Sequence, residues 1–270
     1  MTSAGPADYS LCIDEAEEAR LVAQCEDHRP QAEQLMDRIG LPPGAAALDL
    51  GCGPLGILDV LAARVGPSGT VVGVEREPRC LTMAARQLRA RGLPQVQLVA
   101  ADAAATGLPA DSFDLAHERL VLVNAPRPAD ILAEMVRLTR PGGYVAVQDF
   151  DCSSWTCVPS HPDWARLAAL VAAAWSGDLY IGRRLPTLLR QAELIDVEID
   201  TSVRVFGPGH VNHQLLPRFV EIHRDRILAG GTLGPAELDG RLRRVAEHLA
   251  DPTTFTLHPT LFTVWGRKPE

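Results

Sequence analysis

Lysine is almost missing from this chain: of its 26 basic residues, only Lys268 is a lysine. We interpret the excess of arginine, together with abundant alanine, as high-GC coding rather than as arginine selected for phosphate contacts. Positive charge is also in deficit, because 34 acidic residues give a formal net charge of −8. Without a basic field to attract phosphates, we expect neither a nucleic acid nor an anionic membrane surface as a partner.

Long apolar runs and paired cysteines are absent as well. No run approaches the roughly 20 apolar residues of a membrane span, and residues 1–10 lack the apolar core of a signal peptide. The six cysteines are scattered without a C-x-x-C pair, which disfavours a disulfide framework or a zinc site. We therefore expect a cytoplasmic protein without a metal ion. Hydrophobic residues make up 46 % of the 270 residues, which suffices for a substantial core.

The segment from Leu48 to Gly56 (LDLGCGPLG) is the most informative part of the chain. An apolar run over 45–50 ends in a glycine turn, and an amphipathic stretch over 55–65 follows, which predicts a strand, a tight turn and a helix. Gly51 and Gly53 can adopt backbone angles barred to other residues and let a ligand approach closely. With Gly56, the spacing also fits the dinucleotide pattern G-x-G-x-x-G, which alone is a weak indication of NAD binding.

Three acidic residues distinguish between cofactors. Asp49 precedes the turn, where a carboxylate would repel a pyrophosphate but attract the sulfonium and amino groups of S-adenosylmethionine (SAM). Glu75 ends a second strand, 70–74, and can accept both hydroxyls of a ribose. Asp102 follows a third strand, 96–100, where the amino group of an adenine would lie. These positions favour SAM over NAD.

In this order, the motifs resemble those of the class I SAM-dependent methyltransferases over residues 45–150, and more loosely the ubiquinone/menaquinone-type and natural-product branch of that family. The matching segments are 49–54 (DLGCGP), 74–75 (VE), Asp102, 112–117 (SFDLAH) and 138–144 (LTRPGGY). Pro54-Leu55 departs from the small residue and glycine that the family often has. The resemblance implies SAM as cofactor and S-adenosylhomocysteine (SAH) as product. It implies these cofactor-binding residues: Asp49, Gly51, Cys52, Gly53, Glu75, Arg76, Asp102, Ala103 and Glu118.

The alternation of strands and helices predicts a doubly wound, mostly parallel α/β sheet, and the resemblance implies seven strands with an antiparallel hairpin at 196–206 and 254–265. Helices are expected at 14–28, 31–39, 78–91, 128–139, 163–176 and 185–192. We divide the chain into an N-terminal helical cap, 1–44, and a SAM-binding domain, 45–270, with helical insertions at about 152–180 and 207–253. Because ligands bind at the carboxyl ends of such strands, the cap and insertions are expected to wall a substrate pocket. The cap helices can equally be a solvated pair that only covers the fold, or mediate a homodimer.

Two residues near the ends of the fourth and fifth strands are catalytic candidates. His117 could take a phenol or enol proton as a neutral imidazole; the alternative, which has more weight, is that it points into the sheet packing. Asp149 could act as a base if burial raises its pKa.

Four residues are candidates for substrate binding. Arg119 could hold a carboxylate or phosphate in bidentate fashion, or pair with Asp114 or Glu118. Asp151 could bind substrate hydroxyls. Tyr9 and Tyr180 could belong to a lid, or only contribute to packing.

Other clusters carry weaker hypotheses. His210, His213, Glu221 and His223 could suggest a metal, but H-x-x-H on an uncertain loop is poor ligand geometry, so surface helix residues are the better interpretation. Trp155, Trp164 and Trp175 fit ordinary packing or the lining of a flat apolar acceptor site.

We therefore predict a SAM-dependent methyltransferase that acts on a small molecule, either a natural product or another biosynthetic intermediate. Alignment of acceptor, methyl group and sulfur can supply about 7–11 kcal/mol, so the sequence predicts the cofactor site better than a catalytic residue. Three alternatives stay open. They are an enzyme that uses bound SAM for a rearrangement, cyclisation or decarboxylation, an NAD-dependent oxidoreductase, and a non-catalytic SAM-binding protein.

Overall fold

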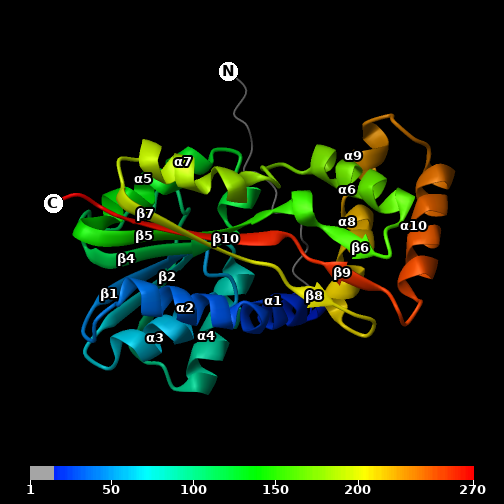
Figure 1. The fold of residues 1–270 in the computed structure, drawn as a ribbon. Helices are drawn as coiled ribbons and strands as arrows, with labels where there is room; N and C mark the ends of the chain where they lie inside the picture. Colours follow the sequence, from blue (N-terminus) through cyan, green and yellow to red (C-terminus); the bar gives the residue numbers. More distant parts are fainter. Residues whose placement is uncertain (1–14) are drawn as a thin grey trace.

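The central sheet is built from short runs of β-branched and aliphatic residues. Such runs suit strands that are covered by helices on both faces. The computed structural model describes residues 15–270 and contains a seven-stranded sheet of order β3-β2-β1-β4-β5-β10-β7 (Figure 1). The strands are β1 (Ala46–Leu50), β2 (Thr70–Glu75), β3 (Val96–Ala100), β4 (Phe113–Arg119), β5 (Thr139–Asp151), β7 (Ile195–Ser202) and β10 (Thr260–Arg267). Neighbours among β1 to β5 are parallel, whereas β10 runs antiparallel to both β5 and β7. The predicted doubly wound α/β fold with an antiparallel end is confirmed.

Helices pack on both faces of this sheet (Figure 1). One face carries α2 (Arg29–Ile39), α3 (Leu58–Val65) and α4 (Pro78–Arg91), and the other carries α5 (Pro128–Leu138) and α7 (Leu185–Gln191). The ends of α2 and α4 follow local chemistry. Each has a proline in its first turn and ends at a left-handed glycine, Gly40 or Gly92, the usual asymmetry of helix termini. The helix α1 (Glu15–Asp27) precedes α2 and extends beyond the sheet.

The two faces of the sheet have separate apolar cores. Alternate strand residues point to opposite faces, so Ala47, Leu115 and Ala146 pack toward α2 and α3. Their neighbours Leu48 and Ala116 pack on the face of α5. The same alternation decides on which face each polar residue at a strand end lies.

A second, smaller sheet lies beyond one end of the main sheet (Figure 1). It has the order β6-β9-β8, and its strands are β6 (Thr156–Val158), β8 (Val205–Phe206) and β9 (Phe255–Leu257). Four helices accompany it: α6 (Pro162–Ala174), α8 (Leu215–Ile222), α9 (Arg224–Ala229) and α10 (Pro235–Leu249). Short 3-10 turns connect these parts: η1 (Leu122–Asn124), η2 (Cys152–Ser154), η3 (Ile181–Arg184) and η4 (Val211–Gln214).

The second sheet was not predicted. Two segments expected as single strands are each two strands. The segment 196–206 leaves the main sheet and enters the small one, and the segment 254–265 begins in the small sheet and ends in the main one. Pro259 stands at the second break, where it has no N–H to give to a ladder. Within residues 15–270, no helix is long and apolar enough to cross a membrane.

Candidate cofactor and active site

The glycine turn after β1 is bonded tightly to β2. The N–H groups of Gly51 and Cys52 both donate to the carbonyl of Val74, at 2.7 and 3.0 Å. Gly51 and Gly56 have φ values of 66° and 56°, and a Cβ on Gly56 would lie 2.1 Å from an oxygen of Asp49. The turn therefore needs glycine for its backbone angles and for its close packing. Cys52 was predicted to bind the cofactor, but its N–H is already bonded to Val74, and its side chain is buried beside the turn.

Asp49 lies beneath the turn and is only 1 % exposed. One carboxylate oxygen accepts from the N–H of Ile57 at 3.1 Å, at the start of α3. The other lies 2.7 Å from Nδ1 of His117. These two partners hold the Asp49 carboxyl below the glycine turn.

His117 belongs to a hydrogen-bonded chain that crosses four strands. Its Nε2 lies 3.3 Å from Oε1 of Gln148, whose Nε2 donates to the hydroxyl of Thr263 at 3.0 Å. The His117 side chain is fully buried, and both of its ring nitrogens have protein partners. A general base must reach the proton that it removes. The geometry therefore favours the alternative in which His117 packs within the sheet.

The acids after β2 and β3 come together on neighbouring strand ends. One oxygen of Glu75 accepts from the N–H of Gly53 at 3.0 Å, and the other accepts from the N–H groups of Arg76 and Glu77. Arg76 Nη1 lies 3.8 Å from a carboxylate oxygen of Asp102.

These residues also leave room for a ligand. The Asp102 side chain is 57 % exposed, and Ala103 follows it in the turn after β3. A Cβ on Gly53 would meet nothing within 4 Å. Carboxylate oxygens beside such a turn suit the hydroxyls of a ribose and the amino group of an adenine. The residues present therefore fit SAM.

Two carboxyl groups are fully buried on the opposite face, at the ends of β4 and β5. Glu118 Oε2 accepts from the N–H of Val121 at 2.8 Å, while Oε1 has no partner among residues 15–270. Asp149 accepts from the N–H groups of Val123 (3.0 Å) and Phe150 (3.3 Å). Burial raises the pKa of Asp149 to about 8. Burial also raises the pKa of Glu118 well above its usual range, and the nearby Asp149 adds to this shift. At neutral pH the pair therefore retains a proton.

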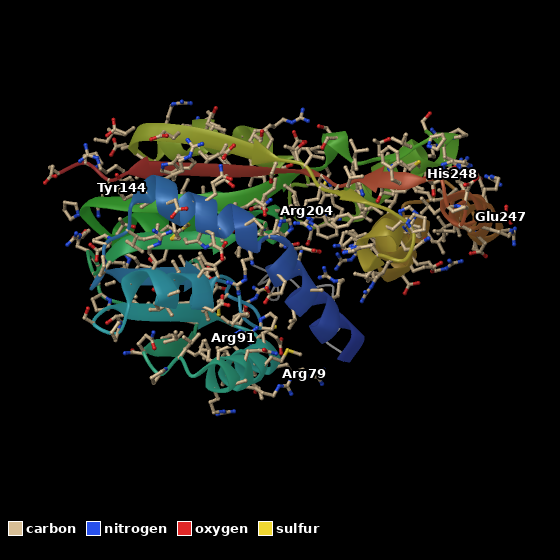
Figure 2. The ribbon with its side chains drawn as sticks, turned by 60° about the horizontal axis from the view of Figure 1, so that its bottom comes forward. Arg79, Arg91, Tyr144, Arg204, Glu247 and His248 are labelled. Carbon is tan, nitrogen blue, oxygen red and sulfur yellow. The ribbon has the colours of Figure 1, made fainter. Side chains whose placement is uncertain are left out.

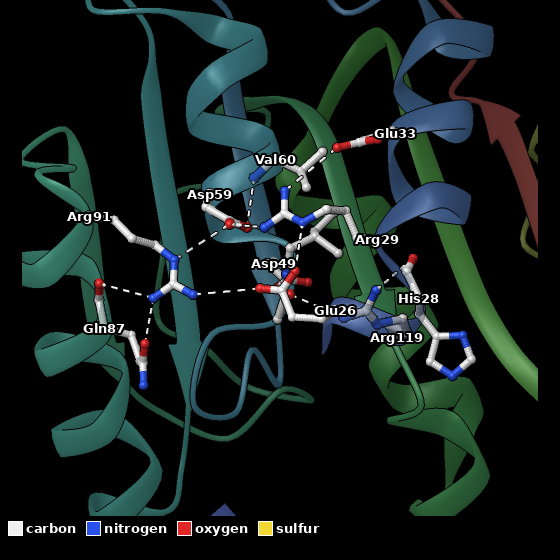
Figure 3. Close-up of polar contacts among 12 residues, drawn as sticks. Glu26, His28, Arg29, Glu33, Asp49, Asp59, Val60, Gln87, Arg91 and Arg119 are labelled. Atoms are coloured by element: carbon white, nitrogen blue, oxygen red, sulfur yellow. Dashed lines mark hydrogen bonds and ion pairs between the residues drawn. The ribbon is translucent and has the colours of Figure 1, made fainter. Parts of the chain in front are cut away.

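Arg119 connects the cap helices to the glycine turn (Figure 3). Its guanidinium donates to the carbonyls of His28 and Gly56, at 3.4 and 3.1 Å. Neither the expected substrate contact nor a bond to Asp114 or Glu118 is needed to explain this geometry.

An ion-pair network fastens the same helix junction to the core (Figure 3). Arg29 pairs with Glu26 and Asp59, and Arg91 reaches the same two carboxylates at 3.6 and 3.7 Å. The junction of α1 and α2 is thus bound to both α3 and α4.

The remaining substrate candidates are only partly free to bind a ligand. Asp151 forms a bidentate pair with Arg183, with distances of 2.6 and 2.8 Å. Burial alone would raise the pKa of Asp151, but the Arg183 guanidinium and the Ser153 hydrogen bonds hold it below its usual value. Tyr180 is 41 % exposed, and the Arg183 guanidinium lies 5.9 Å from its ring centroid. Tyr9 lies outside the described residues.

The interpretation of the histidine-rich segment as surface helix residues is wrong for His213 and His223, which are 1 % and 2 % exposed. The two ring nitrogens of His213 lie 3.0 and 3.1 Å from backbone carbonyl oxygens of Phe206 and Leu249. In the part of the chain that the structure describes, no three His, Cys, Asp or Glu residues converge as a metal site. Trp164 and Trp175 each donate their indole N–H to a backbone carbonyl, of Trp155 and Val123 respectively.

Sequence reasoning missed a group of rings beside these strand ends: His28, Phe150, Phe206 and His258. The only available signal was that Phe150 directly follows Asp149 at the end of β5. The other three come from distant segments, and no local pattern links them.

Comparison with known proteins agrees with the predicted family. A family model described as a methyltransferase domain matches residues 41–193. Trans-aconitate 2-methyltransferase of Methylobacterium radiotolerans is 36 % identical over 191 residues, 68 % of each chain. Nocamycin O-methyltransferase of Saccharothrix syringae is 34 % identical over 149 residues, 54 % of this chain and 51 % of that one.

The fold agrees as well. A solved methyltransferase-like structure from Bacillus halodurans C-125 superposes with a TM-score of 0.60 at 17 % identity, over 88 % of this chain and 98 % of that one. The chain spans about half the length of most of the curated relatives that it matches. The chain belongs to the class I SAM-dependent methyltransferase family.

Proposed function

We propose that this protein binds SAM at the carboxyl ends of β1, β2 and β3 and transfers its methyl group to a small-molecule acceptor. The observation that carries the proposal is the bond between Glu75 and the Gly53 N–H, which places a carboxylate against the glycine turn beside Arg76 and Asp102. This acidic set suits the ribose, ammonium and adenine amino groups of SAM. Family membership supports the same cofactor.

Bound SAM supplies a methyl group on a positively charged sulfur, which is a strong leaving group. The chain's own residues then need to orient the reactants and exclude water. Asp49 acts from beneath the turn as a fixed negative charge, because Ile57 and His117 already occupy its oxygens. Glu118 has one unpartnered oxygen among the described residues and remains a candidate for the cofactor side.

We propose Asp149 rather than His117 as the catalytic candidate because of its pKa, since both side chains are fully buried and have protein hydrogen-bond partners. The Asp149 carboxyl has a pKa of about 8 and can exchange a proton near neutral pH, which is the property of a general acid or base. We propose Arg119 as the residue that holds the cap on the glycine turn rather than as a substrate ligand. Asp151 remains a proposed substrate-binding residue and Tyr180 a proposed lid residue, and both lie beside Arg183.

We propose further that the cap, 1–44, and the insertions at about 152–180 and 207–253 wall the acceptor site. The bonds from the α1–α2 junction to the core support a wall rather than a dimer interface, and sedimentation equilibrium distinguishes the two. The acidic charge of −8 supports a small molecule rather than a nucleic acid as acceptor. The proposed compartment is the cytoplasm.

The test is turnover with SAM and a panel of small acceptors, followed by mass spectrometry of both products. We expect SAH to accumulate together with an acceptor that has gained one methylene unit in mass. An isomer or a decarboxylated product would instead show the non-methylating chemistry. SAH binding without any turnover across the panel would show a binding protein.

A further inference from the structure

Five rings meet where the two sheets join. This Phe150 cluster consists of His28, Phe150, Trp155, Phe206 and His258. The Phe150 centroid lies 5.6 Å from that of His28 and 5.7 Å from that of His258. His258 in turn lies 4.9 Å from Phe206 and 6.4 Å from Trp155. The five residues come from the α1–α2 junction, the end of β5, the segment after η2, the end of β8 and the turn between β9 and β10.

Three members of the cluster carry buried polar atoms that lack a hydrogen-bond partner within residues 15–270. These atoms are Nδ1 of His28, Nε1 of Trp155 and both ring nitrogens of His258. The three side chains are only 3 %, 6 % and 2 % exposed. A buried polar group without a partner opposes folding, and native proteins leave few of them. Four such atoms in one cluster therefore call for a polar partner that enters among the rings.

Two buried rings elsewhere in the same part of the molecule have partners, whereas Nε2 of His223 also lacks one among residues 15–270. Both ring nitrogens of His213 lie within hydrogen-bond distance of backbone carbonyl oxygens, and the Trp164 indole donates to the carbonyl of Trp155. The fold thus satisfies neighbouring rings with its own backbone. Of the seven buried side-chain atoms without a partner among residues 15–270, four lie in the Phe150 cluster.

The charge around the cluster is positive. Burial is the main cause that lowers the pKa of His28 and His258, and the nearby Arg204 lowers both further. Arg119 adds to the shift of His28, and Arg20 adds to that of His258, whose pKa falls to about 3. The imidazoles are neutral at pH 7, so each has one N–H to donate. Asp27 pairs with Arg204 at 3.2 Å and offsets part of the positive charge. Figure 2 shows Arg204 between the main sheet and the part of the molecule that contains α8 and α10.

The cluster also lies beside the cofactor turn. Arg119 donates to the carbonyl of His28 and to that of Gly56, so one side chain spans the distance between them. Phe150 follows Asp149, the buried acid at the end of β5.

We propose that the Phe150 cluster is the acceptor site and that it takes a flat aromatic acid. The rings contact the flat body, and the N–H groups of His258 and Trp155 donate to its anionic oxygen. This assignment rests on the proposed function and adds a substrate class to it. A neutral or non-planar acceptor does not match both the rings and the donors.

The test uses 2-naphthoate as the probe, with 2-naphthylmethanol as its neutral counterpart of the same shape. Both are titrated into the full chain in the presence of saturating SAH. We expect 2-naphthoate to bind at least tenfold more tightly than the alcohol. His258→Phe and Trp155→Phe keep a ring in place and remove the donors, so each should weaken 2-naphthoate about tenfold or more.

The control is His248→Phe, because Figure 2 shows His248 at the far end of the helical part, away from Arg204. It should leave both affinities unchanged. SAH binding is measured separately for every variant. It shows whether the variant is folded and whether its proposed cofactor site is intact. A chain that binds SAH but not 2-naphthoate would overturn the acceptor assignment, since buried water would then satisfy the donors. Equal binding of 2-naphthoate to wild type and His258→Phe would overturn it too. Failure to bind SAH would instead refute the proposed function.

Discussion

Replacing Asp149 by asparagine should change how the stability of this protein depends on pH. The carboxyl is fully buried, and burial raises its pKa from 3.8 to about 8. Below pH 4 the group is protonated in both the folded and the unfolded chain. Between about pH 4 and pH 8 only the folded chain keeps the proton, so the free energy of unfolding falls as pH rises. Above pH 8 neither state holds the proton, and the loss is complete.

The size of this effect follows from the shift. One proton difference changes the free energy of unfolding by about 1.4 kcal/mol per pH unit, so the whole window amounts to about 6 kcal/mol. Asparagine is neutral at every pH and removes this slope. The carboxyl of Asp149 accepts hydrogen bonds from the backbone N–H groups of Val123 and Phe150, one on each oxygen. An asparagine amide has one carbonyl oxygen in place of these two, so it keeps only one of the bonds. That lost hydrogen bond costs about 1 kcal/mol at all pH values.

The measurement is urea unfolding of wild type and Asp149→Asn at pH 4.5, 6 and 7.5. We expect the two stability curves to meet near pH 4.5, where the cost of the lost hydrogen bond cancels the gain from removing the carboxyl, and the variant to be several kcal/mol more stable at pH 7.5. Asp130→Asn on α5 is the control, because its carboxyl is 45 % exposed and its curve should follow that of wild type. Parallel curves for wild type and Asp149→Asn would refute the account of a buried, protonated acid.

Three further substitutions test the cofactor turn and the cap. Gly56→Ala should lower the thermal unfolding temperature more than Gly53→Ala, because the new Cβ at position 56 would lie 2.1 Å from an oxygen of Asp49. Gly53→Ala has only the cost of a left-handed backbone, about 1–2 kcal/mol, and equal losses for the two variants would contradict this packing. Glu75→Ala should weaken SAM and SAH equally in calorimetry, by about 1.5–3 kcal/mol, because both share the ribose; a loss for SAM alone would place the residue elsewhere. Arg119→Met should speed hydrogen exchange in α1 and α2, since the bond from the core to the His28 carbonyl is lost. Unchanged protection would show that the ion pairs alone hold the cap.

The sequence predicted the meeting of the cofactor residues because the strand order of this fold is fixed. Once β1, β2 and β3 are parallel neighbours, Asp49, Glu75 and Asp102 must lie along one edge of the sheet. The direction of a side chain at a strand end is a different matter. It depends on register, and the pairing of Asp49 with His117 is what turns that imidazole into the sheet.

Contacts to the backbone escaped prediction for another reason. Arg119 binds the carbonyls of His28 and Gly56, and a carbonyl has no signal in the sequence. The small sheet was missed because its strands are two or three residues long and lie far apart in the chain, too short for any periodic pattern. The Phe150 cluster depends on that sheet, so it too was out of reach.

The most direct test of the central claim is calorimetric titration of the purified chain with SAH, with NAD as a parallel control. The account predicts micromolar binding of SAH and no response to NAD, because the strand ends present carboxylates to a ribose and an ammonium rather than donors to a pyrophosphate. NAD binding without SAH binding would contradict it and would assign Glu75 to the ribose of a dinucleotide.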